Sequence, residues 1–256
     1  MAFDKVVDSA KLDAGMTATA NAIRGKTGGT DPIAWDESTG FKTAVEGITS
    51  GDVDSDTDEI VAALMNRTLK ELHNQTATTI SATRLCQNNR ALEKVNLPMV
   101  TALDSYIFST CSALVDVNLP RLTGMQMANF ENCTALTELI FPSISSIGNN
   151  SNFQGCVCLQ KVDFGRKEIQ NKARFSQYSF RNCAALNVII LRAENYIWSL
   201  GSTNNFDGTP FAAGGTGGTV YVPEALIESY QTATNWSTLY AAGTCTFLPI
   251  EGSEYE

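Results

Sequence analysis

The chain has 256 residues, a net charge of −9 and an isoelectric point near 4.7. An acidic chain is repelled by phosphate backbones and anionic headgroups, so nucleic acid and anionic lipid are disfavoured as main partners. Most of the excess lies in residues 1–60, where twelve acidic side chains and five basic ones give −7. The length allows a sizeable core and one or two domains.

The N-terminal segment carries no targeting pattern. Residues 1–16 contain several charged side chains and no apolar stretch follows them, so we expect no secretory signal. No run approaches the roughly eighteen apolar residues that a membrane-spanning helix needs. We therefore expect no insertion into a membrane.

Three short helices are predicted before residue 73. Residues 14–24 follow Asp13 as a possible N-cap and end at Gly25. Residues 39–48 place Phe41, Val45 and Ile48 on one helical face. After a polar linker at 51–58, residues 60–72 read as a third helix, which we expect to cap the N-terminal end of the repeats described next.

A segment that begins at Phe108 and ends in Leu119-Pro120 recurs along residues 86–191. Aligned copies give a leucine column with spacings of 22, 22, 23 and 27, made of Leu92, Leu114, Leu136, Leu159 and Leu186. Two further columns hold Phe108, Phe130, Phe153 and Phe180, and Cys111, Cys133, Cys156 and Cys183. Repetition at this period indicates a solenoid, because one copy cannot bury its apolar side chains alone.

Each copy also predicts one strand. Three residues after the column leucine stands a Val, Leu or Ile, and two residues later stands a Leu or Phe. These two side chains share one face of a strand because side chains alternate. Proline follows at positions 98, 120 and 142, where the missing N–H ends pairing. The copies therefore predict a parallel sheet along one side of the stack.

The pattern F-x-x-C-x-x-L-x-x-V-x-L-P resembles the BspA-like class of leucine-rich repeats over residues 80–191. This resemblance implies an α/β solenoid, a leucine-rich-repeat superhelix with a parallel sheet of about five to seven coils. We divide the chain into a helical attachment region (1–50), a linker with a capping helix (51–79), the repeats (80–200) and a C-terminal cap (201–256). Such repeats mostly bind other molecules, and what they bind varies.

The C-terminal cap is predicted from strand and helix signals after the last repeat. Residues 195–200 and 219–222 read as strands, and Pro223 opens a helix that runs to about Tyr230. Trp236 and Tyr240 follow, and a last strand is expected near residues 244–248. This block looks like the terminal element of many such repeat proteins.

The N-terminal segment shows a second resemblance. Residues 19–28 (Thr-Ala-Asn-Ala-Ile-Arg-Gly-Lys-Thr-Gly), followed by an apolar stretch that ends at Ile48, resemble a short module in tail and baseplate-associated proteins of phages of Gram-positive bacteria. This resemblance implies a virion component assembled in the host cytoplasm, a tail or baseplate partner for residues 1–50, and a homo-oligomer. It also implies a host surface protein or glycan as ligand. The alternative is a bacterial interaction or adhesion protein, in the cytoplasm or on the cell surface by a signal-less route.

The outward strand positions are the first candidates for ligand binding, because a rigid array of small polar and charged side chains suits protein or glycan recognition. Aromatic side chains near the C-terminal cap are a second candidate, although they could instead seal the last coil. From the two sets we select Glu93, Asn96, Asp116, Asn118, Glu138, Lys161, Asp163, Tyr196 and Trp198. The other aromatic candidates are Tyr178, Phe206 and Phe211.

Motifs for catalysis and metal binding are incomplete. Residues 20–27 fit a relaxed phosphate-loop pattern but lack its first glycine and a preceding strand. Asp52 to Asp58 alternate like a calcium loop, yet Thr57 and Ala63 stand where Gly and Glu are needed. His73 is the only histidine, and no nucleophile, base and orienter combine around it. We expect a non-enzymatic protein with no cofactor and no metal, and with free thiols in the cysteine column.

Overall fold

The computed structural model describes residues 63–148, 150–165 and 173–256. The chain divides into two compact units, Met1–Gly40 and Phe41–Glu256, and the described residues belong to the second. Several predictions lie outside the described residues. They are the helices at 14–24 and 39–48, the linker at 51–58, and the incomplete motifs at 20–27 and 52–63 apart from Ala63. The attachment region and its boundary at residue 50 also lie outside them.

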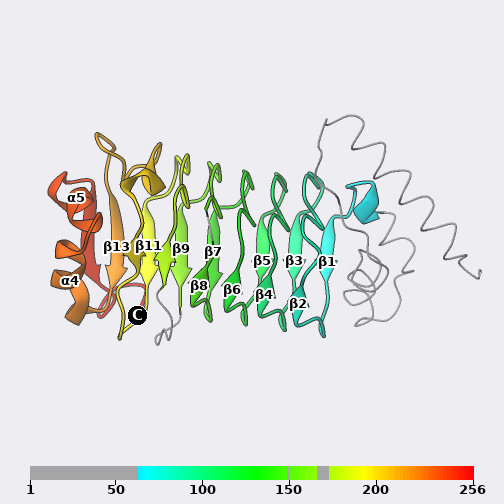
Figure 1. Ribbon diagram of the computed structural model, residues 1–256, viewed down its shortest axis with the longest axis horizontal. Coiled ribbons are helices and arrows are strands. Elements are labelled where there is room, and N and C mark those ends of the chain that lie inside the picture. Colours follow the sequence, from blue (N-terminus) through cyan, green and yellow to red (C-terminus); the bar gives the residue numbers. More distant parts are fainter. Residues whose placement is uncertain (1–62, 149, 166–172) are drawn as a thin grey trace, which may run out of the picture. The chain divides into compact units, whose positions relative to one another are not determined.

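The repeats form a solenoid in which each turn of chain, here called a coil, adds a strand to two rows (Figure 1). The first row contains two parallel sheets in the orders β1-β3-β5 and β14-β13-β11-β9-β7. Its strands are β1 (Glu71–His73), β3 (Lys94–Asn96), β5 (Asp116–Asn118), β7 (Glu138–Phe141), β9 (Lys161–Phe164), β11 (Val188–Leu191), β13 (Gly218–Val222) and β14 (Cys245–Pro249). The predicted strand of each copy is confirmed.

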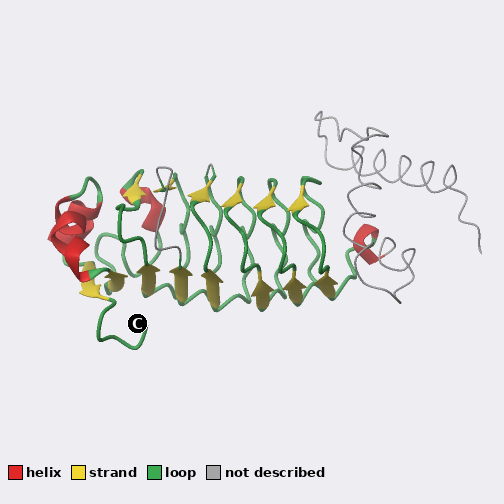
Figure 2. Ribbon diagram, turned by 90° about the horizontal axis from the view of Figure 1, so that it is seen from below, coloured by secondary structure: helices red, strands yellow, loops and turns green. Residues whose placement is uncertain are grey.

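The second row lies on the opposite side of the coils and consists of two-residue strands (Figure 2). It is ordered β2-β4-β6-β8 and β10-β12, again with parallel pairing. Its members are β2 (Thr79–Ile80), β4 (Ala102–Leu103), β6 (Gly124–Met125), β8 (Ser146–Ile147), β10 (Arg174–Phe175) and β12 (Ser199–Leu200).

The predicted apolar columns fill the space between the two rows. All five column leucines are fully buried, and Val95 lies opposite Val117 in the register of β3 and β5. The phenylalanine column stacks from coil to coil, with ring centroids 5.5 Å apart for Phe108 and Phe130 and 5.3 Å apart for Phe153 and Phe180. Burying each such side chain contributes about 1.5–3 kcal/mol, so the columns dominate the stability of the stack.

The cysteine column consists of free, buried thiols. Each donates a hydrogen bond to a carbonyl of the preceding coil, as Cys133 Sγ does to Phe108 O at 3.1 Å and Cys183 Sγ to Phe153 O at 3.0 Å. Burial raises the pKa of the Cys111 thiol to about 12, so it stays protonated at neutral pH. The prediction of free thiols in this column agrees with the geometry.

The chain before the first repeat differs from the prediction. Residues 63–65 are helical, but the chain turns at Arg67, which has φ of 59°, and then enters β1. Leu72 and His73 therefore belong to a strand that pairs with β3, and the helix predicted through Leu72 is wrong in its C-terminal part. Leu64 is fully buried within the core cluster. The capping role of this helix stays a prediction.

The C-terminal strands and helix are confirmed. After η1 (Thr203–Phe206), strand β13 leads through Pro223 into η2 (Glu224–Leu226) and α4 (Ile227–Thr232), and α5 (Trp236–Ala241) leads into β14. The two α-helices lie at the far end of the stack from β1 (Figure 1). Trp236 is fully buried and donates from Nε1 to Trp198 O at 2.7 Å, which ties this block to the last coil.

Replacing Leu136 by Ala tests the column packing. We expect a loss of about 2–5 kcal/mol in the free energy of unfolding, as for other buried leucines, measured by urea denaturation. The matched control is Thr137→Ala at the exposed neighbour, which should change stability by less than about 0.5 kcal/mol. Equal, small effects of both substitutions would show that Leu136 is not packed between coils.

Candidate binding surface

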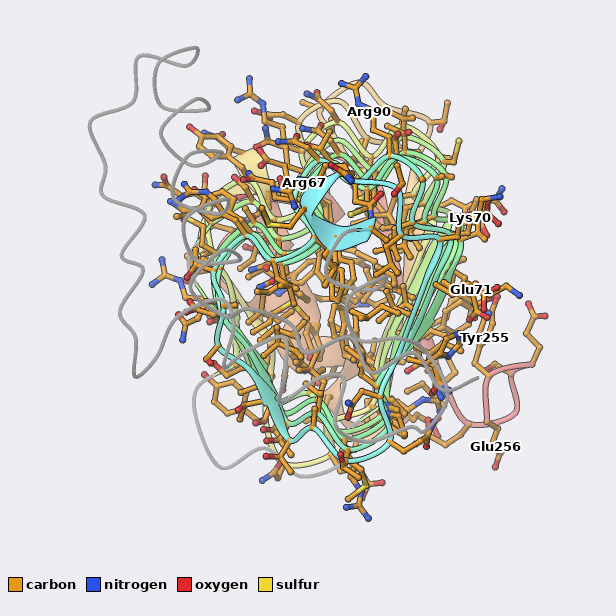
Figure 3. All side chains as sticks on the ribbon, turned by 90° about the vertical axis from the view of Figure 1, so that its right-hand side faces the viewer. Arg67, Lys70, Glu71, Arg90, Tyr255 and Glu256 are labelled. Carbon is orange, nitrogen blue, oxygen red and sulfur yellow. The ribbon has the colours of Figure 1, made fainter. Side chains whose placement is uncertain are left out.

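The outer face of the first row presents two columns of side chains, because residues alternate inward and outward along each short strand. One column consists of Glu71, Lys94 and Asp116, in register over β1, β3 and β5, followed by Glu138 and Lys161, in register over β7 and β9. The other reads His73, Asn96, Asn118, Ile140 and Asp163. Glu71 stands on the outside of the first strand in the view along the stack (Figure 3).

A groove of about 640 Å³ lies on this face over β1, β3 and β5 and reaches the end of β7. Its polar walls come from both outward columns, and its apolar walls come from two prolines and from aliphatic side chains. The lining residues are Glu71, His73, Lys94, Val95, Asn96, Asp116, Val117, Asn118, Pro120, Ile140 and Pro142.

The charges at the N-terminal end of the groove are satisfied by one another. Glu71 accepts from His73 Nε2 at 2.9 Å and lies 3.6 Å from Lys94 Nζ. The hydrogen bond with His73 and the charge of Lys94 lower the pKa of Glu71. In contrast, the Asp116 carboxylate has no hydrogen bond or ion pair to any residue that the structure describes.

Two amides form the centre of the groove. Asn118 donates from Nδ2 to Asn96 Oδ1 at 2.7 Å. This bond fixes both side chains and leaves Asn96 Nδ2 as a donor and Asn118 Oδ1 as an acceptor. Together with Asp116 they offer the mixed donor and acceptor set that peptide groups or sugar hydroxyls require.

The first row is interrupted between β5 and β7, although every other neighbouring pair of its strands is hydrogen-bonded. We call this interruption the seam. In adjacent coils Val115 N donates to Glu93 O at 2.9 Å and Gln160 N donates to Thr137 O at 2.8 Å. The equivalent bond from Thr137 N to Val115 O is missing between these two described residues. Figures 1 and 2 show the wider interval between β5 and β7.

The C-terminal half of the same face is partly covered by the chain itself. Lys161 Nζ lies 2.7 Å from Glu138 Oε1 and 5.3 Å from the centre of the Tyr255 ring, which packs edge-on against Tyr221. Tyr255 and Glu256 lie on the same side as Glu71 in the view along the stack (Figure 3). The open part of the face is therefore the part that holds the groove.

Comparison with known proteins agrees with the repeat geometry. Residues 78–204 match the family described as BspA type leucine rich repeat region, in six copies. The chain contains a BspA-type leucine-rich repeat region. A comparison with curated proteins gives no match.

Two solved structures are similar to the chain. One is a T. pallidum leucine-rich repeat protein, with 21% identity, 65% of this chain and 78% of that chain covered, and a TM-score of 0.39. The other is a leucine-rich repeat protein from Bacteroides ovatus ATCC 8483, with 16% identity, 72% and 58% covered, and a TM-score of 0.24. None of the comparisons supports the phage-like resemblance of residues 19–48.

The leucine-rich repeat region brings some of the predicted site residues together and separates others. Asn96, Asp116 and Asn118 line the groove, whereas Glu93 is exposed beside it. Glu138 and Lys161 pair with each other. Asp163 has only 8% of its surface exposed and accepts a two-pronged hydrogen bond from Arg192, with Nε–Oδ1 and Nη2–Oδ2 distances of 3.0 Å. This internal ion pair removes Asp163 from an outward binding role.

Four of the five aromatic candidates lie in or against the core, whereas Tyr178 is half-buried with Arg181 Cζ 5.1 Å from its ring centre. Trp198, Phe206 and Phe211 are fully buried, and Tyr196 is partly buried against the core cluster. Including Trp198 among ligand-binding residues is therefore wrong, because its ring packs 5.0 Å from that of Phe175 inside the last coil. Phe206 continues the phenylalanine column, 5.6 Å from Phe180. The alternative that these aromatic residues seal the coils explains their positions.

The sequence does not predict the N-terminal end of the groove. Glu71 lies in the segment predicted as a helix, His73 directly follows that segment, and both precede the repeat region matched at 78–204. The coil that holds them lacks the phenylalanine and cysteine of the later copies, so its signals are Leu69, 23 residues before Leu92 of the leucine column, and Leu72, which pairs with Val95. Pro120 and Pro142 were recognised as strand ends and not as groove walls.

The described residues contain no cluster of three or more His, Cys, Asp or Glu side chains that could hold a metal. In the same residues there is no helix of the length and apolar character needed to cross a membrane. His73 has one side-chain hydrogen bond there, to Glu71. The groove thus offers hydrogen bonds, charge and apolar contact.

Thiol labelling tests the burial of the repeat columns. Cys158 is exposed, and the six other cysteines are buried. Only thiolates react, so we expect a maleimide reagent to modify Cys158 alone in the native protein and all seven after unfolding. Cys158→Ser is the control and should abolish native labelling. Rapid native modification of a second thiol would contradict the packed columns.

Proposed function

We propose that this chain is a non-enzymatic recognition protein that binds a partner molecule through the groove over β1, β3, β5 and β7. The observation that carries the proposal is the Asp116 carboxylate, which has no partner among the described residues, beside the fixed Asn96–Asn118 amide pair. These groups stand on strands held by hydrogen bonds in the first row, so little side-chain order has to be gained on binding. A repeat scaffold with such a preformed surface suits interaction or adhesion.

Binding assays with groove variants test this proposal. The full chain is presented to an array of bacterial surface glycans and to a library of random short peptides. We expect ligands whose affinity falls about tenfold or more with Asn118→Ala, the change expected from losing one or two hydrogen bonds. Asn187→Ala, an exposed asparagine outside the groove, is the matched control. Ligands that bind Asn118→Ala and wild type equally would place recognition elsewhere.

The biological setting has two candidates. In the first, the chain is a phage tail or baseplate component, attached through residues 1–50, oligomeric, and binding a host surface protein or glycan. Its support is the resemblance of residues 19–28 to such proteins. In the second, the chain is a bacterial leucine-rich-repeat interaction or adhesion protein. The repeat region at 78–204 supports both settings equally.

Composition of virus particles separates the two settings. If the chain is a virion component, mass spectrometry of purified particles from the source should detect it, and deletion of residues 1–50 should prevent its incorporation. The repeat region should still fold in the deleted chain, which circular dichroism can check. Particles without the chain, or incorporation independent of residues 1–50, would contradict the virion setting.

A further inference from the structure

The seam is a local opening between two coils that stay joined elsewhere. On the opposite side, β6 and β8 pair in register, Gly124 with Ser146 and Met125 with Ile147. On the turn side, Thr110 N donates to Glu131 O at 2.6 Å. The two coils are therefore bonded at both other corners, and only their edges in the first row are apart.

Pairing of the two edges would bring two acidic side chains together. The register of the other coils places Asp116 on β5 beside Glu138 on β7, and like charges at directly opposed positions are destabilising. Glu138 is balanced by Lys161, and the neighbouring Lys94 is balanced by Glu71. Among these side chains, only the Asp116 carboxylate has no ion pair with a residue in the described part of the chain.

The open seam leaves backbone groups without the partners that equivalent residues have. Asn74 N donates to Asn96 O at 3.1 Å and Leu97 N donates to Asn118 O at 3.0 Å, but no such bond joins Leu119 N to Ile140 O. The bond from Thr137 N to Val115 O is missing as well. The side chain of Val117 is consequently half-buried, whereas Val95 and Leu139 in the same column are buried.

We propose that the seam takes up an extended peptide segment of a partner protein, with a lysine or arginine side chain beside Asp116. The inference rests on the proposed recognition function and names its ligand class. Backbone groups without a bond across the seam, such as the Leu119 N–H and the Thr137 N–H, are the kind of groups that strand addition uses. Asp116, the carboxylate that lines the groove without an ion pair to a described residue, favours one basic side chain on the peptide.

The remaining walls of the groove fit such a segment. Ile140 has 48% of its surface exposed and Val115 has 54%, and Pro120 and Pro142 lie at the strand ends. Side chains of an extended peptide alternate between two faces, so one basic residue can lie by Asp116 while the residues two positions away contact these apolar groups. The Asn96–Asn118 pair can bond a peptide group of the same segment with its free donor and acceptor.

Selection from a library of random short peptides on the full wild-type chain tests the inference. We expect selected peptides to share a lysine or arginine at one position, and to lose about tenfold or more in affinity with Asp116→Asn, since a charge-assisted pair is lost. Asp207→Asn, an exposed aspartate on a turn of η1, is the matched control and should bind as wild type does. Selected peptides without a common basic residue would overturn the inference.

Hydrogen exchange distinguishes strand addition from contact with side chains alone. Bound peptide should slow exchange of the Thr137 and Leu119 amides, whose acceptors are missing in the free protein. Asp116→Lys should slow the same amides without peptide, because opposite charges then face each other across the seam, and it should abolish peptide binding. Peptide that binds with no protection at either amide would overturn the inference.

The glycan array separates failure of this inference from failure of the proposed function. Glycans that bind in an Asn118-dependent manner, with no peptide selected, would leave the recognition function standing and overturn the peptide ligand. If neither class binds in a way that depends on Asn118 or Asp116, both proposals fail.

Discussion

Parallel stacking of one coil on the next is the interaction on which the whole structure depends. Each coil contains short strands and turns. Their N–H groups donate to carbonyl groups of the neighbouring coil, as Thr110 N does to Glu131 O. Its column side chains are likewise buried only by the coils above and below. Because each column leucine and phenylalanine contributes about 1.5–3 kcal/mol on burial, the array is stable when several coils are stacked and not as one.

Much of this arrangement follows from the sequence because the same residue types return at a nearly constant period. The columns of Leu, Phe and Cys, the strand positions and the proline ends were predictable, since they depend on repetition and on side-chain alternation. The second row was not, because strands as short as Thr79–Ile80 have no pattern of their own. The first coil was also misjudged, since Leu64 and Leu72 are spaced as on a helix while a turn at Arg67 separates them.

A further column shows why some structure escapes a residue-type pattern. Two positions after the phenylalanine column, the backbone has a positive φ in every coil, whatever the residue: Asn88, Thr110, Asn132, Gly155, Asn182 and Gly208, with φ from 56° to 75°. The position is defined by backbone geometry, which Asn and Gly tolerate and Thr tolerates poorly. At Gly155 a Cβ atom would also contact Asn132 Oδ1, so a larger residue there would require the Asn132 side chain to move.

The candidate site separates into a predictable part and a part set by details of packing. That Asp116 and Glu138 occupy equivalent positions in neighbouring coils follows from the 22-residue spacing alone, and so does the proximity of Asn96 and Asn118. The covering of Lys161 by Tyr255 and the Asp163–Arg192 pair depend on side-chain conformations and on the path of the C-terminal residues, which no local pattern encodes. In a repeat array each coil contacts only its neighbours, so an unpaired edge between β5 and β7 is not corrected from a distance. The interruption also does not spread to other coils, because the hydrogen bonds on the other two sides keep the stack in register. A solenoid can therefore keep a local opening for binding while the remaining coils retain their full pairing.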